Sequence, residues 1–391
     1  MTNYELISLL LNNKVVDAFQ FFSTCNFKIT SSKVSFKALN NLVDEYITNE
    51  TKERNSMFEE VLKTGHSSLF AKTDNKDFFG QEVSRSILID KLTIEVFSTL
   101  HSFFDTYAQW INAVLFGDLA LPIKTVSLGS VISKIDQFSE YSGQFVTDFR
   151  SISISHEYKY ISDINNVIKH RHQIYTKAKF NLFEGTGSVT LPAFHKDNNS
   201  YSDVEVLNII STCINYCEKL LLDSINFVEL FYSTGNNLHV SKRIYNPKTY
   251  MLFENEKDYQ ELKNIKNSIH FIELDQSNMQ DEYQILLFSN DTTNKEISMY
   301  NSPYEIIAIK DISTNGYIGI LKPLDTASYT FNDGRLLEYR KYKVYKQNFE
   351  LGLVTEMLNQ NFHYYPYLSD LQVVILNPNA TGTEDKSSAP E

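Results

Sequence analysis

An apolar stripe over residues 82–116 is the feature that most constrains the fold of this chain. Its members recur at helical spacing: Leu88, Leu92, Val96, Leu100, Phe103, Phe104, Tyr107, Ile111, Val114 and Leu115. This periodicity is typical of an amphipathic helix with one broad buried face, and Gly117 follows where such a helix would end. A helix over this segment spans about 50 Å at 1.5 Å per residue. The sequence therefore predicts a bundle of long helices.

Apolar periodicity predicts the remaining helices of this region. They cover 3–24 (two short helices broken near Asn12 and Asn13), 33–63, 129–150, 156–175 and 203–233. Residues 65–80 have the composition of a loop. The run Glu184-Gly-Thr-Gly187 is a turn signal between β-prone runs, so we expect a short hairpin near 180–194.

The pattern changes after Gly235, where short strand-like runs replace the helical period. The predicted strands are 270–274, 283–288, 305–309, 317–321, 338–345 and 371–376, with one helix over 349–359. The expected fold class is α+β: an N-terminal long-helix bundle followed by a smaller antiparallel β-rich domain. The expected divisions are an N-terminal helical extension (1–80), the bundle (81–235), the β-rich domain (236–376) and a disordered tail (377–391).

Composition limits the function. The net charge of −12 argues against a general nucleic-acid-coating protein, although it leaves room for a local basic site. The N-terminus lacks the pattern of a signal peptide and no apolar run is long enough to span a membrane, so we expect a cytoplasmic protein without membrane contact. Cys25, Cys213 and Cys217 are expected to be buried thiols, and no metal or cofactor is predicted.

The most unusual feature is the polar cluster Asn165–His172 on the predicted helix 156–175. At 100° per residue, Arg171 falls inside the apolar stripe, Asn165 and His172 lie at its edge, and Lys169 lies further round. A guanidinium in an apolar stripe is costly unless it is paired or opens into a cleft. Asp105, Gln109 and Asn112, on the predicted helix 82–116, are the expected partners. The alternative is an ion pair that only clamps two helices.

Two stretches carry clustered basic residues. Residues 159–179 contain five Lys and Arg against one Asp (Lys159, Lys169, Arg171, Lys177 and Lys179). This island predicts an anionic ligand, or an ordinary solvated face. In the predicted strand 338–345, alternation puts Tyr339, Lys341, Lys343 and Tyr345 on one face. That face suits single-stranded nucleic acid, or it is a solvent-facing strand whose lysines protect a sheet edge.

The chain resembles the HEPN superfamily in three features. It has four predicted long helices, an Asn-x-x-x-Lys-His-Arg cluster late in the third, and a predicted hairpin before the fourth. The likeness covers roughly residues 82–234 and points to bacterial members found among defence and toxin genes. Active HEPN ribonucleases carry Arg, four to six residues, then His, and act as dimers with a composite cleft. Arg150-Ser-Ile-Ser-Ile-Ser-His156 fits this spacing. The resemblance implies His156 as the base and Arg150 as the phosphate-binding cation. Alternatively, Ser155 caps the third helix and His156 is merely its exposed first residue.

Three functions follow as expectations. The first is a HEPN-like effector, a metal-independent endoribonuclease in antiviral defence or toxin activity. It would act as a homodimer, with a protein trigger recognised by the C-terminal domain. The second is a non-catalytic HEPN-like module that binds RNA, a nucleotide or a protein through Asn165, Lys169, Arg171 and His172. The third is a structural interaction protein.

Overall fold

The computed structural model describes residues 1–234 except 2–4, 7–8, 11–12, 14, 16–17, 68–73, 79, 139–140 and 142. Beyond Thr234 it describes strands β8 to β16, helix α8 and the single residues Asn255 and Lys263. The chain divides into two compact units. One comprises Gln20–Ile111 with Val126–Leu230, and the other Met1–Phe19, Asn112–Thr125 and Phe231–Glu391. The fold is α+β, as expected: long helices come first and strands dominate afterwards. The domain boundaries drawn from the sequence stay predictions.

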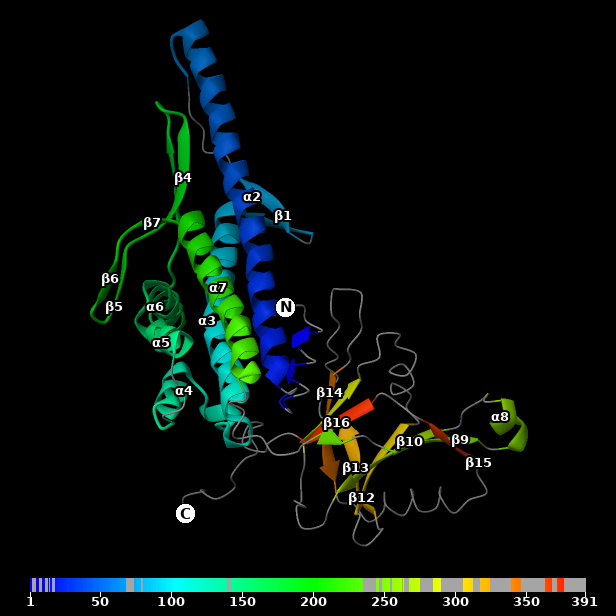
Figure 1. Cartoon of the computed structure of the whole chain (residues 1–391). Helices are drawn as coiled ribbons and strands as arrows, with labels where there is room; N and C mark the ends of the chain where they lie inside the picture. Colours follow the sequence, from blue (N-terminus) through cyan, green and yellow to red (C-terminus); the bar gives the residue numbers. More distant parts are fainter. Residues whose placement is uncertain are drawn as a thin grey trace, which may run out of the picture. The chain divides into compact units, whose positions relative to one another are not determined.

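The four longest helices of the first unit are α2 (Phe19–Thr64), α3 (Arg85–Phe116), α6 (His156–His170) and α7 (Val206–Ser233) (Figure 1). Polar contacts fix their directions. Ser35 of α2 bonds Glu95 of α3 and Lys28 bonds Thr106, so these two helices are antiparallel. Tyr107 and Trp110 of α3 bond Leu220 and Ser224 of α7, so this pair is parallel.

The core lies along α3, as its apolar stripe predicts. Phe97, Phe103, Tyr107 and Trp110 are each at most 1% exposed. Trp110 donates its indole N–H to Ser224 Oγ at 3.0 Å, which satisfies a polar group that burial would otherwise penalise. The helix ends at Gly117, whose φ of +48° suits glycine.

The prediction of one long helix over 129–150 is wrong. The segment forms two short helices, α4 (Leu128–Ile135) and α5 (Gln144–Ser151). Ser127 caps α4 by accepting from the Ser130 N–H. Gly143 precedes α5 with a φ of +104°, a conformation that no helix continues through. The apolar period continues past this break because each short helix buries one apolar face, with Val131 and Ile135 in α4 and Val146 and Phe149 in α5.

The N-terminal segments also differ from expectation. The helix predicted over 33–63 begins at Phe19, so residues 19–24 belong to α2 rather than to a separate helix. The predicted loop 65–80 contains strand β1 (Asn75–Phe78), which pairs with β2 (Gln81–Ser84). Arg85, at the start of α3 and only 2% exposed, pairs with Asp74 at 2.7 Å and so ties this hairpin to the bundle.

Two hairpins lie between α6 and α7. The predicted one is confirmed: β3 (Lys177–Asn181) pairs with β4 (Thr186–Leu191), and β7 (Val204–Glu205) extends the sheet in the order β3-β4-β7. The second, β5 (Phe194–Lys196) with β6 (Asn199–Tyr201), is not predicted by the sequence pattern. Its two-residue turn contains Asp197 at a φ of +52°, the left-handed region that Asp tolerates better than most residues.

The second unit contains a nine-stranded sheet in the order β15-β9-β10-β12-β13-β14-β11-β16-β8. Its strands are β8 (Ile244–Tyr245), β9 (Lys248–Phe253), β10 (Asn267–Leu274), β11 (Gln284–Ser289), β12 (Glu305–Asp311), β13 (Tyr317–Pro323), β14 (Tyr339–Tyr345), β15 (His363–Tyr367) and β16 (Leu371–Ile375). All six predicted strands are present. The pairing is antiparallel except between β10 and β12, which run parallel. Helix α8 (Glu256–Glu261) is an unpredicted addition.

Strand β14 lies inside this sheet, between β13 and β11. Its lysines therefore do not protect an edge, and that interpretation is wrong. The predicted helix 349–359 and the predicted disordered tail 377–391 lie outside the described residues. None of the helices in the described part of the chain is long and apolar enough to cross a membrane.

Candidate functional site

Helix α6 carries the polar cluster, and it is shorter than predicted. Ser155 caps it by accepting from the Tyr158 N–H at 3.3 Å, so His156 is its first residue, as the alternative interpretation held. The N–H groups of Arg171 and His172 both bond the Val167 carbonyl, at 2.9 and 3.1 Å, and the helix ends at His170. The residues after His170 therefore do not follow the helical period.

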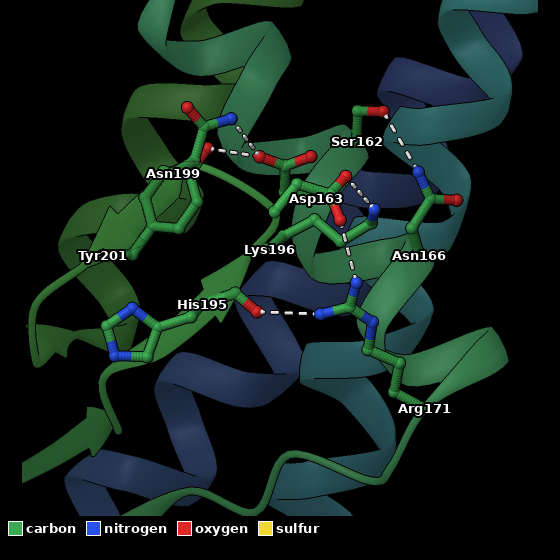
Figure 2. A network of polar contacts seen from close by, with 9 residues as sticks. Ser162, Asp163, Asn166, Arg171, His195, Lys196, Asn199 and Tyr201 are labelled. Atoms are coloured by element: carbon green, nitrogen blue, oxygen red, sulfur yellow. Dashed lines mark hydrogen bonds and ion pairs between the residues drawn. The ribbon is translucent and has the colours of Figure 1, made fainter.

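Arg171 is exposed, and its predicted place in the apolar stripe is wrong. Its side chain is 44% exposed and reaches the β5–β6 hairpin (Figure 2). Nη2 pairs with Asp197 Oδ1 at 2.9 Å, and Nη1 donates to the His195 carbonyl at 3.4 Å. The helical projection failed because Arg171 has a φ of −123° and lies outside α6.

Two of the predicted partners on α3, Asp105 and Asn112, are engaged elsewhere. Asn112 is 2% exposed and exchanges two hydrogen bonds with the backbone of Leu121, at 2.9 and 3.0 Å, so it fixes its own loop. Asp105 is exposed and acts electrostatically on Lys28. Burial lowers the pKa of Lys28, and the neighbouring Cys25 and then the Asp105 carboxylate oppose that shift.

The other members of the cluster separate into buried and exposed positions. Asn165 is 3% exposed, and its Nδ2 has no hydrogen-bond partner in the described part of the chain. Lys169 and His172 are exposed. Asn165 is thus part of the bundle interior, whereas Lys169, Arg171 and His172 face solvent and are available to a ligand.

The β5–β6 hairpin is held on α6 by a carboxylate that the sequence did not single out. Asp163 accepts from the Tyr201 hydroxyl at 2.7 Å and from Asn199 Nδ2 at 2.8 Å (Figure 2). The rings of Tyr160, Phe194 and Tyr201 pack with centroids 4.6 to 5.5 Å apart. Burial, and then the bond to Asp163, raises the pKa of Tyr201. The Asp197-Asn198 pair is the one local signal that could have predicted this turn.

The segment that follows α6 is fixed at several points. Arg171 is held by Asp197, and Ile174 is 5% exposed. Thr176 donates both its N–H and its hydroxyl to Asp90 Oδ1 of α3, at 2.8 and 2.7 Å. Tyr175, between two anchored residues, remains 65% exposed.

We call the cations of this segment and of the β5–β6 hairpin, with two neighbouring side chains, the basic surface. It comprises the cationic residues Lys169, Arg171, Lys177, Lys179 and Lys196, together with His172 and Tyr175. All are exposed except Lys196, whose side chain is 21% exposed. Asp197 is the carboxylate that meets two of these cations, Arg171 and Lys196. The surface thus retains a positive excess in a chain of net charge −12.

Arg150 and His156 are not joined by any hydrogen bond in the described part of the chain. Arg150 lies in the last turn of α5 and donates to Asp136 Oδ1, from Nη2 at 2.6 Å and from Nε at 3.1 Å. His156 is exposed, and its ring centroid lies 6.0 Å from that of Tyr160. The one-turn helix η4 (Ile152–Ile154) separates the two residues. Among the described residues, no group of His, Cys, Asp and Glu could hold a metal ion.

Comparison with known families gives one match. A family model described as a domain of unknown function, DUF8310, matches residues 252–374. The match lies in the β-rich part of the chain and does not reach the basic surface. No curated protein and no solved structure matches the chain.

Proposed function

We propose that the helical unit is a HEPN-like module that binds a phosphate-bearing ligand, an RNA or a nucleotide, on the basic surface. The observation that carries this proposal is the fixed, exposed and positively charged segment at the end of α6, in a chain that is otherwise acidic. Phosphate binding depends on clustered Lys and Arg. Arg171 keeps donors beyond those used by Asp197 and His195, because a guanidinium carries five N–H groups.

A salt titration with charge-reversed variants tests this function. We expect a labelled RNA oligonucleotide to bind with an affinity that falls as salt rises, because bound phosphates release counterions. Lys169→Glu and Lys177→Glu should each weaken binding and reduce the salt slope by about one. The matched control is Lys37→Glu, an exposed lysine of α2 outside this surface. Absence of RNA and nucleotide binding at low salt, or an equal loss in the control, overturns the proposal.

The second candidate is the endoribonuclease, with Arg150 and His156 as catalytic residues. It is favoured by their exposure at the two ends of η4, where both side chains are open to solvent. Because the family resemblance implies a composite dimer cleft, Arg150→Ala and His156→Ala should each abolish cleavage of labelled RNA. A mixture of the two variants should regain part of the activity. No cleavage by the wild-type protein, or cleavage unchanged in both variants, refutes this candidate.

We also propose an oligomeric state, a location and a biological role for the protein. The module acts as a homodimer in the cytoplasm, in antiviral defence or as a toxin, and the C-terminal unit recognises a protein trigger. Light scattering on the full chain tests the dimer, and phage challenge of cells with and without the gene tests the defence role. If the protein is a monomer at the concentration used in the assays, it cannot form a composite cleft, and the dimer proposal is wrong.

A further inference from the structure

Tyr175 is a large aromatic side chain displayed on a rigid support. The residue is 65% exposed, although both its chain neighbours are fixed. Ile174 is buried at 5% exposure, and Thr176 donates two hydrogen bonds to Asp90. The backbone that carries the ring is therefore already ordered. A ligand that stacks on Tyr175 loses little binding free energy to ordering this segment.

Cations lie on the chain immediately after this ring. Lys177 and Lys179 are both exposed and alternate along β3, so they share one face of the strand, about 6.6 Å apart. Strand β3 is at the edge of its three-stranded sheet, so one side of its backbone is also unpaired within that sheet. Tyr175 is two residues upstream of Lys177, and Arg171 precedes it at the end of α6. An aromatic ring and a line of cations thus follow one another along an ordered segment.

We propose that Tyr175 is a base-stacking residue and that the phosphate-bearing ligand of the basic surface is single-stranded RNA. This inference rests on the proposed function and narrows it. Single strands are recognised by aromatic rings on which unpaired bases stack, combined with cations that follow the backbone. A duplex hides its base faces in its own stack, and a phosphate chain without bases offers nothing to the ring.

The experiment compares three labelled ligands by fluorescence anisotropy with the full-length protein. They are an unstructured single-stranded RNA of about 10 nucleotides, within the usual site size, an abasic chain of the same length, and the same RNA as a duplex. Wild-type protein should bind the single strand most tightly. Tyr175→Ala should weaken that binding about 5- to 100-fold, the range for one stacked base, and leave abasic binding unchanged. Tyr175→Phe keeps the ring and should bind as wild type.

Phe183→Ala is the matched control, because Phe183 is 88% exposed on the neighbouring β3–β4 turn. It should bind all three ligands as wild type does. Equal affinity for the single strand and the abasic chain overturns the stacking role while leaving phosphate binding intact. Tighter binding of the duplex overturns the single-strand assignment. If no ligand binds, the proposed function fails together with the inference.

Discussion

Replacing Asp90 by alanine should release the segment that displays Tyr175. Asp90 lies on α3 and reaches across to Thr176 through one carboxylate oxygen, which accepts the Thr176 N–H at 2.8 Å and its hydroxyl at 2.7 Å. The alanine variant removes both acceptor contacts without touching the basic surface itself. The variant also removes one negative charge beside the cations, which by itself would strengthen phosphate binding. Weaker RNA binding would therefore come from the released segment and not from a lost cation.

The structure sets the size of this effect. A hydrogen bond to a charged group contributes about 1.5–3 kcal/mol. Both bonds here share one oxygen, and the groups are only partly buried, so the two together are worth roughly 2 kcal/mol rather than the sum of two full contributions. That value corresponds to about 30-fold more frequent local opening. Asp90→Asn keeps an amide oxygen that can accept the same bonds, and it should lose much less.

Amide hydrogen exchange of peptides covering residues 172–180 measures this opening directly. We expect about 30-fold faster exchange there in Asp90→Ala, with peptides from α7 unchanged and with weaker binding of single-stranded RNA. Asp90→Asn should restore both. If exchange over residues 172–180 stays at the wild-type rate, Asp90 does not anchor the segment. If exchange accelerates and RNA affinity is unchanged, Tyr175 does not need its rigid support.

Three further predictions concern the rest of the unit. Asp163→Ala should lower the free energy of unfolding, measured in urea, by about 1.5–3 kcal/mol. The loss should exceed that of Tyr201→Phe, because Asp163 accepts hydrogen bonds from both Tyr201 and Asn199. Equal losses in the two variants would contradict this. Burial raises the pKa of Cys213 to about 12 and also raises the pKa values of Cys25 and Cys217. Since the thiolate is the reactive form, the native protein should resist thiol reagents near pH 8; rapid labelling without unfolding would refute the burial. Gly143→Ala should cost about 1–3 kcal/mol in the same urea assay, because its φ is +104°; unchanged stability would show that the break between α4 and α5 does not need glycine.

The long elements could be predicted because their signals are local and repeated. The stripe of α3 runs over many turns, so chance matches at single positions do not matter. The strands of the second unit are short apolar runs bounded by turn residues, and all six predicted strands form. The break between α4 and α5 was missed because apolar residues recur at helical spacing on both sides of residues 136–143. Apolar periodicity indicates which face of a segment is buried, but it does not show where the backbone leaves the helical conformation.

The candidate site was harder to predict, because its geometry depends on residues far away in the sequence. Arg171 was placed by a helical period predicted to run to residue 175, whereas α6 ends at His170. Its partner Asp197 belongs to a hairpin that carries only a weak turn signal. Lys169 and His172 were rightly singled out as polar, yet whether they face solvent depends on the length of α6.

The construction of the basic surface argues for a ligand more strongly than its charge does. A solvated face needs no fixed backbone, since exposed lysines gain little from order. Here two carboxylates from separate elements, Asp90 on α3 and Asp197 in the β5–β6 turn, hold the ends of a short segment in place. Between them the chain exposes an aromatic ring that could otherwise have been buried with Ile174. Under the proposed function, an unpaired base stacked on Tyr175 would cover this ring, and the fixed backbone would lower the entropic cost of binding.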